Sequence, residues 1–292
     1  ILMYSHDSTG LGHTHRTLLI ASYLAENLSN CSVLVLTDLS IIGQFKLPQN
    51  VDYVHLPGIV RKADQQYHAN KLNIELENAL KIRRKITQSA ARSFQPNLII
   101  IEQEPFGLQD ELQRILAFVR KELPNTKVIC GFPDVNGEPP IVVRDWNRDG
   151  VYEALDRFCD EIWLYGVQEV FDQVREYQIP ASIARKIFYT GYLRPPRLSF
   201  RRIHKDILRL NRQKPFVLVT AGSGAQGFFL IDNYLRYLES AGASVPFQSI
   251  VVTGPMMRTT DKLLLMARAQ KLPEVIFHRF SKHVLQYVKH AD

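Results

Sequence analysis

Short apolar runs recur along the first part of the chain, and residues with helical spacing lie between several of them. Several of the runs are near-continuous in Val, Ile and Leu, which is typical of parallel strands covered on both faces. Strands are predicted over residues 1–7, 32–38, 51–57, 97–103, 127–133, 161–166 and 186–192. Helices are predicted over 12–28, 72–93, 108–122 and 167–177. This alternation predicts an α/β fold with a doubly wound parallel sheet.

The pattern breaks at Pro195 and Pro196, because proline cannot continue a helix. A basic amphipathic segment follows, for which we expect a linker helix over 196–213. Strands are then predicted over 216–222, 248–254 and 275–280, with helices from about 226, over 259–271 and over 281–291. The sequence therefore predicts two Rossmann-like domains, 1–195 and 214–292, facing across a cleft, with the second incomplete at its C-terminal end.

The net charge of the 292-residue chain is +7, which favours anionic partners. No nucleic-acid-binding motif is present, so we expect no nucleic-acid partner. No apolar stretch approaches the length of a membrane span, and the first residues lack the pattern of a signal peptide. We therefore expect a cytoplasmic protein. The basic linker also allows peripheral contact with the inner face of a membrane.

A glycine turn follows the first predicted strand. Gly10 and Gly12 permit unusual backbone angles, and the helix that begins near His13 points free N–H groups at the same space. The turn suits a phosphate or another anion. A dinucleotide-binding fingerprint is one alternative, with Asp38 as the acid that binds the ribose, although His15 stands where the third glycine belongs. A plain strand–helix turn is another.

His13 is a candidate general base, since a histidine titrates near neutral pH. The acidic residues at strand ends are alternative or assisting bases: Asp7, Glu102, Glu104 and Asp134. Helix capping or loop hydrogen bonding is the other explanation for each of them. We expect no metal site, because His13 and His15 are two residues apart and do not share a helix face.

A second glycine turn opens the second predicted domain, in the run VTAGSGAQGF. It contains Gly222, Ser223, Gly224, Ala225, Gln226 and Gly227. Its N–H groups lie at the start of a helix and suit a phosphate or a diphosphate. It is not a P-loop, because the Gly-Lys-Ser/Thr ending is absent.

Together these segments resemble GT-B glycosyltransferases, and most of all the family-28-type enzymes to which MurG belongs. The likeness lies in STGLGHTHR, in VTAGSGAQGF, in YTGYLRPP and in FHRFSKHVLQYVKHAD. The resemblance implies that Gly10, Gly12 and His13 lie on the acceptor side, and that residues 222–227 hold the donor diphosphate. It also implies that Arg194 reaches this diphosphate, and that the backbone of Phe280 and Ser281 faces the nucleotide base.

The resemblance implies transfer of a hexosyl or N-acetylhexosaminyl group from a nucleotide-sugar, normally a UDP-sugar, to an acceptor hydroxyl. The nucleotide-sugar is a substrate, and neither a cofactor nor a metal is expected. The acceptor is open, with a lipid-linked one among the options, and the glutamate that binds the ribose in this family would follow Asp292. A UDP-N-acetylglucosamine 2-epimerase, an NAD-dependent oxidoreductase and a non-catalytic nucleotide-sugar sensor are the alternatives.

Overall fold

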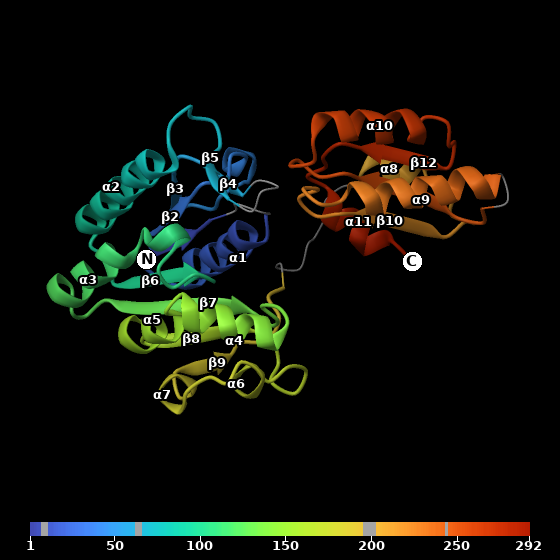
Figure 1. The fold of residues 1–292 in the computed structure, drawn as a ribbon. Coiled ribbons are helices and arrows are strands. Elements are labelled where there is room, and N and C mark those ends of the chain that lie inside the picture. The colour runs from blue at the N-terminus through green and yellow to red at the C-terminus, as the bar shows by residue number, and fades with distance from the viewer. Residues whose placement is uncertain (7–10, 62–65, 195–202, 243–244) are drawn as a thin grey trace. The chain divides into compact units, whose positions relative to one another are not determined.

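The chain divides into two compact units, Ile1–Pro195 and Pro196–Asp292 (Figure 1). This computed structural model describes all residues except 7–10, 62–65, 195–202 and 243–244. No helix of the described residues has both the length and the apolar character needed to cross a bilayer.

The first unit is built on a seven-stranded sheet in the order β3-β2-β1-β6-β7-β8-β9, in which every neighbouring pair is parallel. The strands are β1 (Leu2–Ser5), β2 (Val33–Thr37), β3 (Val51–His55), β6 (Leu98–Glu102), β7 (Lys127–Pro133), β8 (Glu161–Tyr165) and β9 (Ile187–Tyr189). All seven predicted strands of this unit are confirmed. The continuous apolar runs are explained by burial on both faces of the sheet.

The strand order reverses at β1. Leu2 of β1 pairs with Leu34 of β2 on one side and with Ile99 of β6 on the other. In open α/β sheets ligands bind beyond the carboxyl ends of the strands at such a reversal. The residues that follow β1 and β6 are therefore placed where a site is expected.

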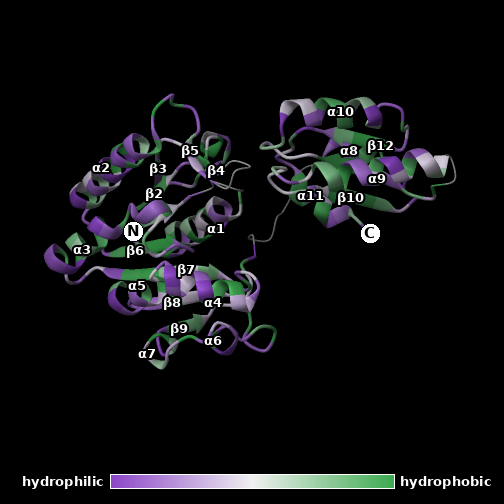
Figure 2. Ribbon diagram, in the orientation of Figure 1, coloured by the Kyte–Doolittle hydropathy of each residue, from purple (hydrophilic) through white to green (hydrophobic). Residues whose placement is uncertain are grey.

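Helices cover both faces of this sheet. The helix α1 (Gly12–Asn27) packs on one face, against Met3 and Ile100. On the other face lie α2 (Leu76–Phe94), α3 (Gln113–Glu122) and α5 (Val151–Phe158), which pack around Tyr4 and Ile101. Figure 2 shows the strands largely in green, whereas α2 carries purple on its outer side. Successive strand residues thus enter opposite cores.

The remaining elements of this unit are short helices and a hairpin. They are η1 (Ile42–Gln44), β4 (Ile59–Arg61), β5 (Tyr67–Ala69), η2 (Leu108–Asp110), α4 (Pro139–Arg148), α6 (Gln173–Glu176) and α7 (Ala181–Ala184). The helix predicted over 167–177 is wrong in extent, because the Asp172 carboxylate caps the N–H groups of Val174 and Arg175 and starts α6 there. The helix predicted over 108–122 is interrupted at Gln109, whose φ is +50°.

The second unit has a three-stranded parallel sheet in the order β10-β11-β12. Its strands are β10 (Phe216–Thr220), β11 (Gln248–Val252) and β12 (Val275–His278), and its helices are α8 (Lys205–Arg209), α9 (Phe228–Ala241), α10 (Thr259–Ala269) and α11 (Val284–His290). The helices α9 and α10 pack on one face of the sheet, and α8 and α11 pack on the other. The three strands and the three helices predicted after residue 214 are confirmed.

The linker helix is shorter than the predicted range of 196–213. Among the described residues of that range, only Lys205–Arg209 are helical, and Leu210 is extended with ψ 141°. The remainder of the prediction, up to residue 202, lies outside the described residues.

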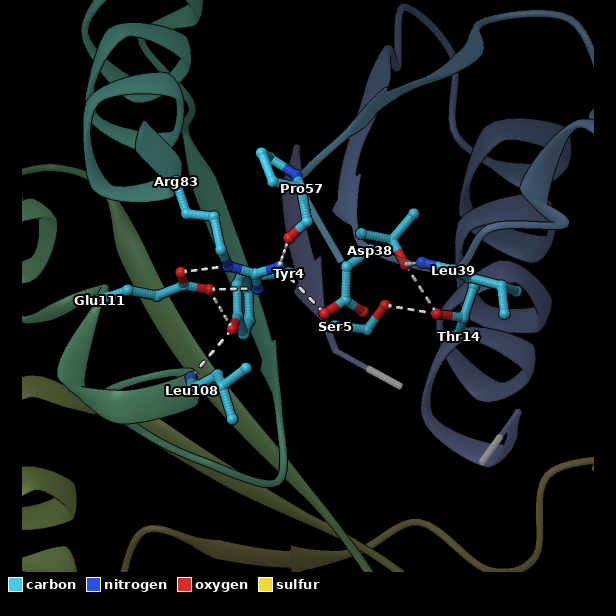
Figure 3. Close-up of polar contacts among 10 residues, drawn as sticks. Tyr4, Ser5, Thr14, Asp38, Leu39, Pro57, Arg83, Leu108 and Glu111 are labelled. Carbon is cyan, nitrogen blue, oxygen red and sulfur yellow. Dashed lines mark hydrogen bonds and ion pairs between the residues drawn. The ribbon is translucent and has the colours of Figure 1, made fainter. Parts of the chain in front are cut away.

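One buried cation ties four segments of the first unit together (Figure 3). Arg83 of α2 is fully buried, and its Nε and Nη2 donate to Glu111 at 2.6 and 2.7 Å. Its Nη1 donates to Asp38 at 3.0 Å and to the carbonyl of Pro57 at 2.7 Å. Tyr4 of β1 donates its hydroxyl to Glu111 at 2.5 Å.

This network keeps its central charge. Burial by itself lowers the pKa of Arg83, but the hydrogen bonds that Arg83 donates to Glu111 and the nearby charges outweigh it, and the pKa is raised. Burial and Glu111 raise the pKa of the Tyr4 hydroxyl, which stays a donor. The cation and its two carboxylates are therefore mutually dependent inside a low-dielectric core.

Replacing Arg83 by leucine should destabilise the first unit by about 3–5 kcal/mol, because Asp38 and Glu111 would stay buried without their cation. Urea unfolding followed by tryptophan fluorescence measures this unit, since Trp146 and Trp163 both lie in it. The neighbouring Arg84→Leu is the control. Arg84 pairs with the exposed Glu77, so its loss should cost less than about 1 kcal/mol. Equal losses in both variants would contradict the assigned role.

Candidate functional site

A buried carboxylate lies at the carboxyl end of β6, next to the strand reversal. The side chain of Glu102 is 2% exposed. Its Oε1 accepts from Nε of Arg16 at 2.5 Å, and its Oε2 accepts from the hydroxyl of Tyr165 at 3.3 Å. Two donors from different elements, α1 and β8, therefore fix this carboxylate in place.

His13 faces that carboxylate from the first turn of α1. Its Nδ1 lies 3.6 Å from Oε1 of Glu102, within ion-pair range when the imidazole is protonated, and 3.3 Å from Nη2 of Arg16. The His13 side chain is 17% exposed, so it is accessible from one side. With its proton on Nδ1, the nitrogen beside the carboxylate, a neutral His13 imidazole has Nε2 as the acceptor for a proton from a substrate hydroxyl.

A second histidine and a second glutamate complete the arrangement. The ring of His6 stacks on that of His13, with centroids 5.4 Å apart, and its Nε2 lies 3.4 Å from Oε1 of Glu104. Burial by itself lowers the pKa of His6, but Glu104 and the charge of Asp38 outweigh it, so the pKa is raised. We name His6, His13, Arg16, Glu102 and Glu104 the His13 group.

A chain of hydroxyls positions the start of α1 (Figure 3). Thr14 Oγ1 lies 3.0 Å from the hydroxyl of Ser5, at the end of β1, and 2.9 Å from that of Thr37, at the end of β2. Thr37 in turn accepts the N–H of Leu39 at 3.2 Å. Thr14 follows His13 directly, so these bonds hold the His13 backbone against both strands.

The acidic residues proposed from the sequence divide into separate groups. Glu102 and Glu104 belong to the His13 group. Asp134 follows β7, and its Oδ1 accepts the N–H of its neighbour Val135 at 3.0 Å. Asp7 lies outside the described residues, as does Gly10.

Gly12 does not have the unusual backbone angle expected for it. It is the first residue of α1, with helical geometry, and a Cβ at this position would lie 3.5 Å from Arg16, an ordinary contact. Asp38 does not fit the role of ribose-binding acid that the dinucleotide-binding alternative gives it. Its carboxylate is buried and accepts a hydrogen bond from Arg83, so it is already bound where a ribose hydroxyl would have to donate.

Sequence reasoning missed three members of this arrangement: His6, Arg16 and Tyr165. A signal existed for Arg16, which lies three residues after His13 and therefore on the same helix face. His6 was hidden within a predicted strand, and Tyr165 within another. Only the strand order brings β8 close enough for Tyr165 to reach Glu102, and that order is not encoded locally.

No group of three His, Cys, Asp or Glu side chains in the described ranges is arranged to hold a metal ion. His15, the second histidine of the opening turn, is an exposed residue whose imidazole is only partly desolvated. Its pKa is lowered by burial and by the charge of Arg16.

The second unit carries a tight glycine loop, residues 221–227, between β10 and α9. Gly222 and Gly224 have φ values of +59° and +85°. A Cβ on Gly224 would lie 2.0 Å from the carbonyl oxygen of Thr253, and one on Gly227 would lie 2.2 Å from Cβ of Ala221. Both positions therefore require glycine, for packing reasons that a plain turn would not impose.

The open side of this loop differs from its packed side. Gly222, Ala225 and Gln226 are exposed, and a Cβ on Gly222 would meet nothing within 4 Å. Internal bonds hold the loop, from Gly224 N–H to Ala221 at 3.0 Å and from Gly227 N–H to Gly224 at 3.1 Å. Gly227 caps α9 without any side-chain bond, and the first turn of α9 holds no acidic residue. The first N–H groups of a helix have no partners within it, so the start of α9 is able to accept an anion.

Three further predicted residues lie in different surroundings. Ser281 donates its hydroxyl to Tyr287 at 3.3 Å and accepts the N–H of His283 at 3.1 Å. Phe280, beside it, is 41% exposed. Arg194 is exposed at the end of the first unit.

Both units have a parallel α/β architecture, and solved structures share the fold over nearly the full chain. A glycosyltransferase from Rickettsia africae aligns with a TM-score of 0.55 at 10% identity, covering 100% of this chain and 70% of its own. Anabaena HepE in complex with UDP-glucose aligns with a TM-score of 0.52 at 14% identity, covering 100% and 71%.

An epimerase shares the architecture as well. The UDP-GlcNAc 2-epimerase of Neisseria meningitidis, bound to UDP-GlcNAc, aligns with a TM-score of 0.55 at 12% identity, covering 98% of this chain and 74% of its own. The chain therefore has the GT-B fold. No protein-family profile and no curated protein matches it.

The His6 pKa yields a pH-dependent prediction. The folded protein should hold the His6 proton more tightly than the unfolded chain, so the His6–Glu104 contribution to stability is complete below about pH 6.5 and is lost as pH rises through the raised folded pKa. An NMR titration of the imidazole should give a pKa above 6.5 in the wild type and a lower value in Glu104→Gln. Glu122→Gln, an exposed change on α3, should leave the titration as it is. A wild-type pKa below 6.5 would contradict the assignment.

Proposed function

We propose that the chain is a nucleotide-sugar-dependent glycosyltransferase that moves a hexosyl or N-acetylhexosaminyl group from a UDP-sugar to an acceptor hydroxyl. The observation that carries the proposal is the glycine loop. Its buried glycines fix the shape of the loop, and the start of α9 that follows has backbone N–H groups without partners inside the helix and no side-chain cap. A diphosphate is an anion that such a helix start after a glycine loop can bind.

The charge distribution supports placing the donor on the second unit. Residues 196–292 contain 15 Lys and Arg against 6 Asp and Glu, whereas residues 1–195 contain 21 against 23. The positive charge of the chain is therefore concentrated in the unit with the glycine loop. This attracts a nucleoside diphosphate and stabilises the charge that develops on it as the sugar leaves.

The His13 group is the proposed base. His13 takes the proton of the acceptor hydroxyl, the acceptor oxygen bonds to the anomeric carbon, and the bond from that carbon to the diphosphate breaks. Glu102 stabilises the imidazolium that results, and Arg16 and Tyr165 hold Glu102 in position. We further propose that Arg194 assists the departing diphosphate and that Phe280 and Ser281 face the base.

The acceptor side is less constrained. An acceptor hydroxyl must approach His13 beyond the carboxyl ends of β1 and β6. A lipid-linked acceptor, and with it a peripheral position on the inner face of a membrane, remains our proposal from the basic character of the linker segment. No nucleic-acid partner and no cofactor enters this scheme.

Epimerisation of a UDP-sugar is the second candidate, because a UDP-GlcNAc 2-epimerase has the same fold at a similar TM-score. An epimerase needs no acceptor. Incubation with UDP-N-acetylglucosamine alone therefore separates the two. A change of configuration at carbon 2 of the sugar supports the epimerase, and an unchanged nucleotide-sugar supports the transferase.

Isothermal titration should show binding of UDP to the full chain, and Gly222→Ala should weaken it by roughly 10-fold or more, because the new methyl group enters the space reserved for the diphosphate. Gly242→Ala is the matched control. Gly242 also has a positive φ, of +57°, and an added Cβ there would meet nothing within 4 Å, but it follows the far end of α9. Absence of UDP binding to the wild type would refute the donor site.

His13→Gln should reduce UDP release from UDP-glucose or UDP-N-acetylglucosamine, over a panel of acceptor alcohols, by roughly 100-fold or more, since the base is removed. UDP affinity should stay within about twofold of wild type, because the proposed donor contacts lie on the other unit. His15→Gln, on the same helix, should retain activity. A His13→Gln variant as active as wild type would exclude His13 as the base.

A further inference from the structure

A second buried carboxylate, in the second unit, organises residues that the proposed chemistry does not use. The side chain of Asp206, on α8, is 2% exposed. Its Oδ2 accepts from the hydroxyl of Tyr287 at 2.8 Å and from Nε2 of His278 at 2.8 Å, and it lies 3.1 Å from Nδ1 of His204. One carboxylate thus joins α8 to the end of β12 and to α11.

The bonds of this cluster have a fixed direction. A carboxylate only accepts hydrogen bonds, so Tyr287 must donate to Asp206, and its oxygen is then free to accept from Ser281 at 3.3 Å. Ser281 in turn accepts the N–H of His283 at 3.1 Å. The result is a polarised chain from the backbone of residue 283 to Asp206, in which each bond strengthens the next.

The ionised form of Asp206 is favoured. Burial by itself raises the pKa of this carboxyl, but Tyr287, His278 and His204 outweigh it, and the pKa is lowered. The pKa of the Tyr287 hydroxyl is raised to about 12, so this group remains a donor over the physiological range. His283 stacks on His204, with ring centroids 4.3 Å apart, and closes the cluster.

The strand β12 leads into a turn, residues 279–283, at the carboxyl edge of the sheet. This turn and the glycine loop both contact Thr253. Thr253 donates its hydroxyl to the carbonyl of Arg279 at 3.1 Å, and its own carbonyl is the atom that excludes a Cβ from Gly224. The next loop also donates from Met256 N–H to Ser223 at 2.8 Å. The 279–283 turn therefore lines the same edge as the proposed diphosphate site.

We propose that Asp206 and Tyr287 are positioning residues that hold the 279–283 turn, and with it the exposed Phe280 ring, in the shape that receives the base of the nucleotide. This inference rests on the proposed function. Neither residue touches the ligand. They act through Ser281. Its hydroxyl donates to Tyr287 and accepts the backbone N–H of His283, and so connects the cluster to the main chain of the turn.

The test compares two pairs of matched variants. Tyr287→Phe and Ser281→Ala each cut the chain at one hydroxyl. Tyr234→Phe and Ser249→Ala remove the bond between Tyr234 and Ser249, 2.5 Å long, which lies at the opposite, amino end of β11 in the same unit. Each pair removes a tyrosine–serine hydrogen bond, so a general loss of stability should affect both pairs alike.

Titration with UDP is the first readout, and amide hydrogen exchange of residues 279–283 is the second. We expect the first pair to weaken UDP binding by roughly 3- to 10-fold, the effect of one hydrogen bond, and to speed exchange in the turn. The second pair should leave the UDP affinity and the exchange rates of residues 279–283 within about twofold of wild type.

The outcomes separate the two proposals. Unchanged UDP affinity in Tyr287→Phe and Ser281→Ala would overturn the positioning role and leave the donor site intact. Equal weakening in all four variants would also overturn it, since a general loss of stability would then explain the effect. A wild-type protein that binds no UDP would remove the proposed function, and this inference with it.

Discussion

The guanidinium of Arg83 is the interaction on which the shape of the first site depends. It binds Glu111, Asp38 and the carbonyl of Pro57, and so joins α2 to the segments that follow β2, β3 and η2. Tyr4, one residue before Ser5 on β1, donates to the same Glu111. Because a lone buried charge is so costly, these segments must close together, and the end of β1 is then fixed where His6 begins the His13 group.

The two units build the carboxyl edges of their sheets in different ways. In the first, charged and hydroxyl side chains lie at the carboxyl edge of the sheet, and Gly12 has ordinary helical geometry. In the second, the edge is shaped by main chain packed against main chain, with glycines at positions where a Cβ would meet Thr253 or Ala221. A proton-transfer site needs positioned side chains, whereas an anion cradle needs positioned N–H groups.

The strands and the doubly wound class were predictable, because continuous apolar runs identify buried parallel strands without any long-range information. The glycine loop was also predictable locally, because its glycines stand between an apolar strand run and a helical pattern. The His13 group was predictable only in part. His13 and the glutamates stood at recognisable strand and helix ends, but Tyr165 reaches Glu102 only through the strand order. Arg83 and Asp206 lie in helices, where nothing in the local pattern marks a buried charge. The start of α6 was also missed, because it depends on a single capping carboxylate.

The strand reversal at β1 also bears on how the protein folds. Leu2 pairs with Ile99, so the central pair of the sheet forms only after a very long loop has closed, and both sheets are wholly parallel. Entropy is lost in each closure before contacts compensate, which makes such topologies slow to fold. The small antiparallel β4–β5 hairpin is the sole locally closed pair among the described strands, and it lies outside both sheets. The β1–β6 pair, whose carboxyl ends adjoin the His13 group, therefore needs the longest loop closure of any strand pair among the described residues.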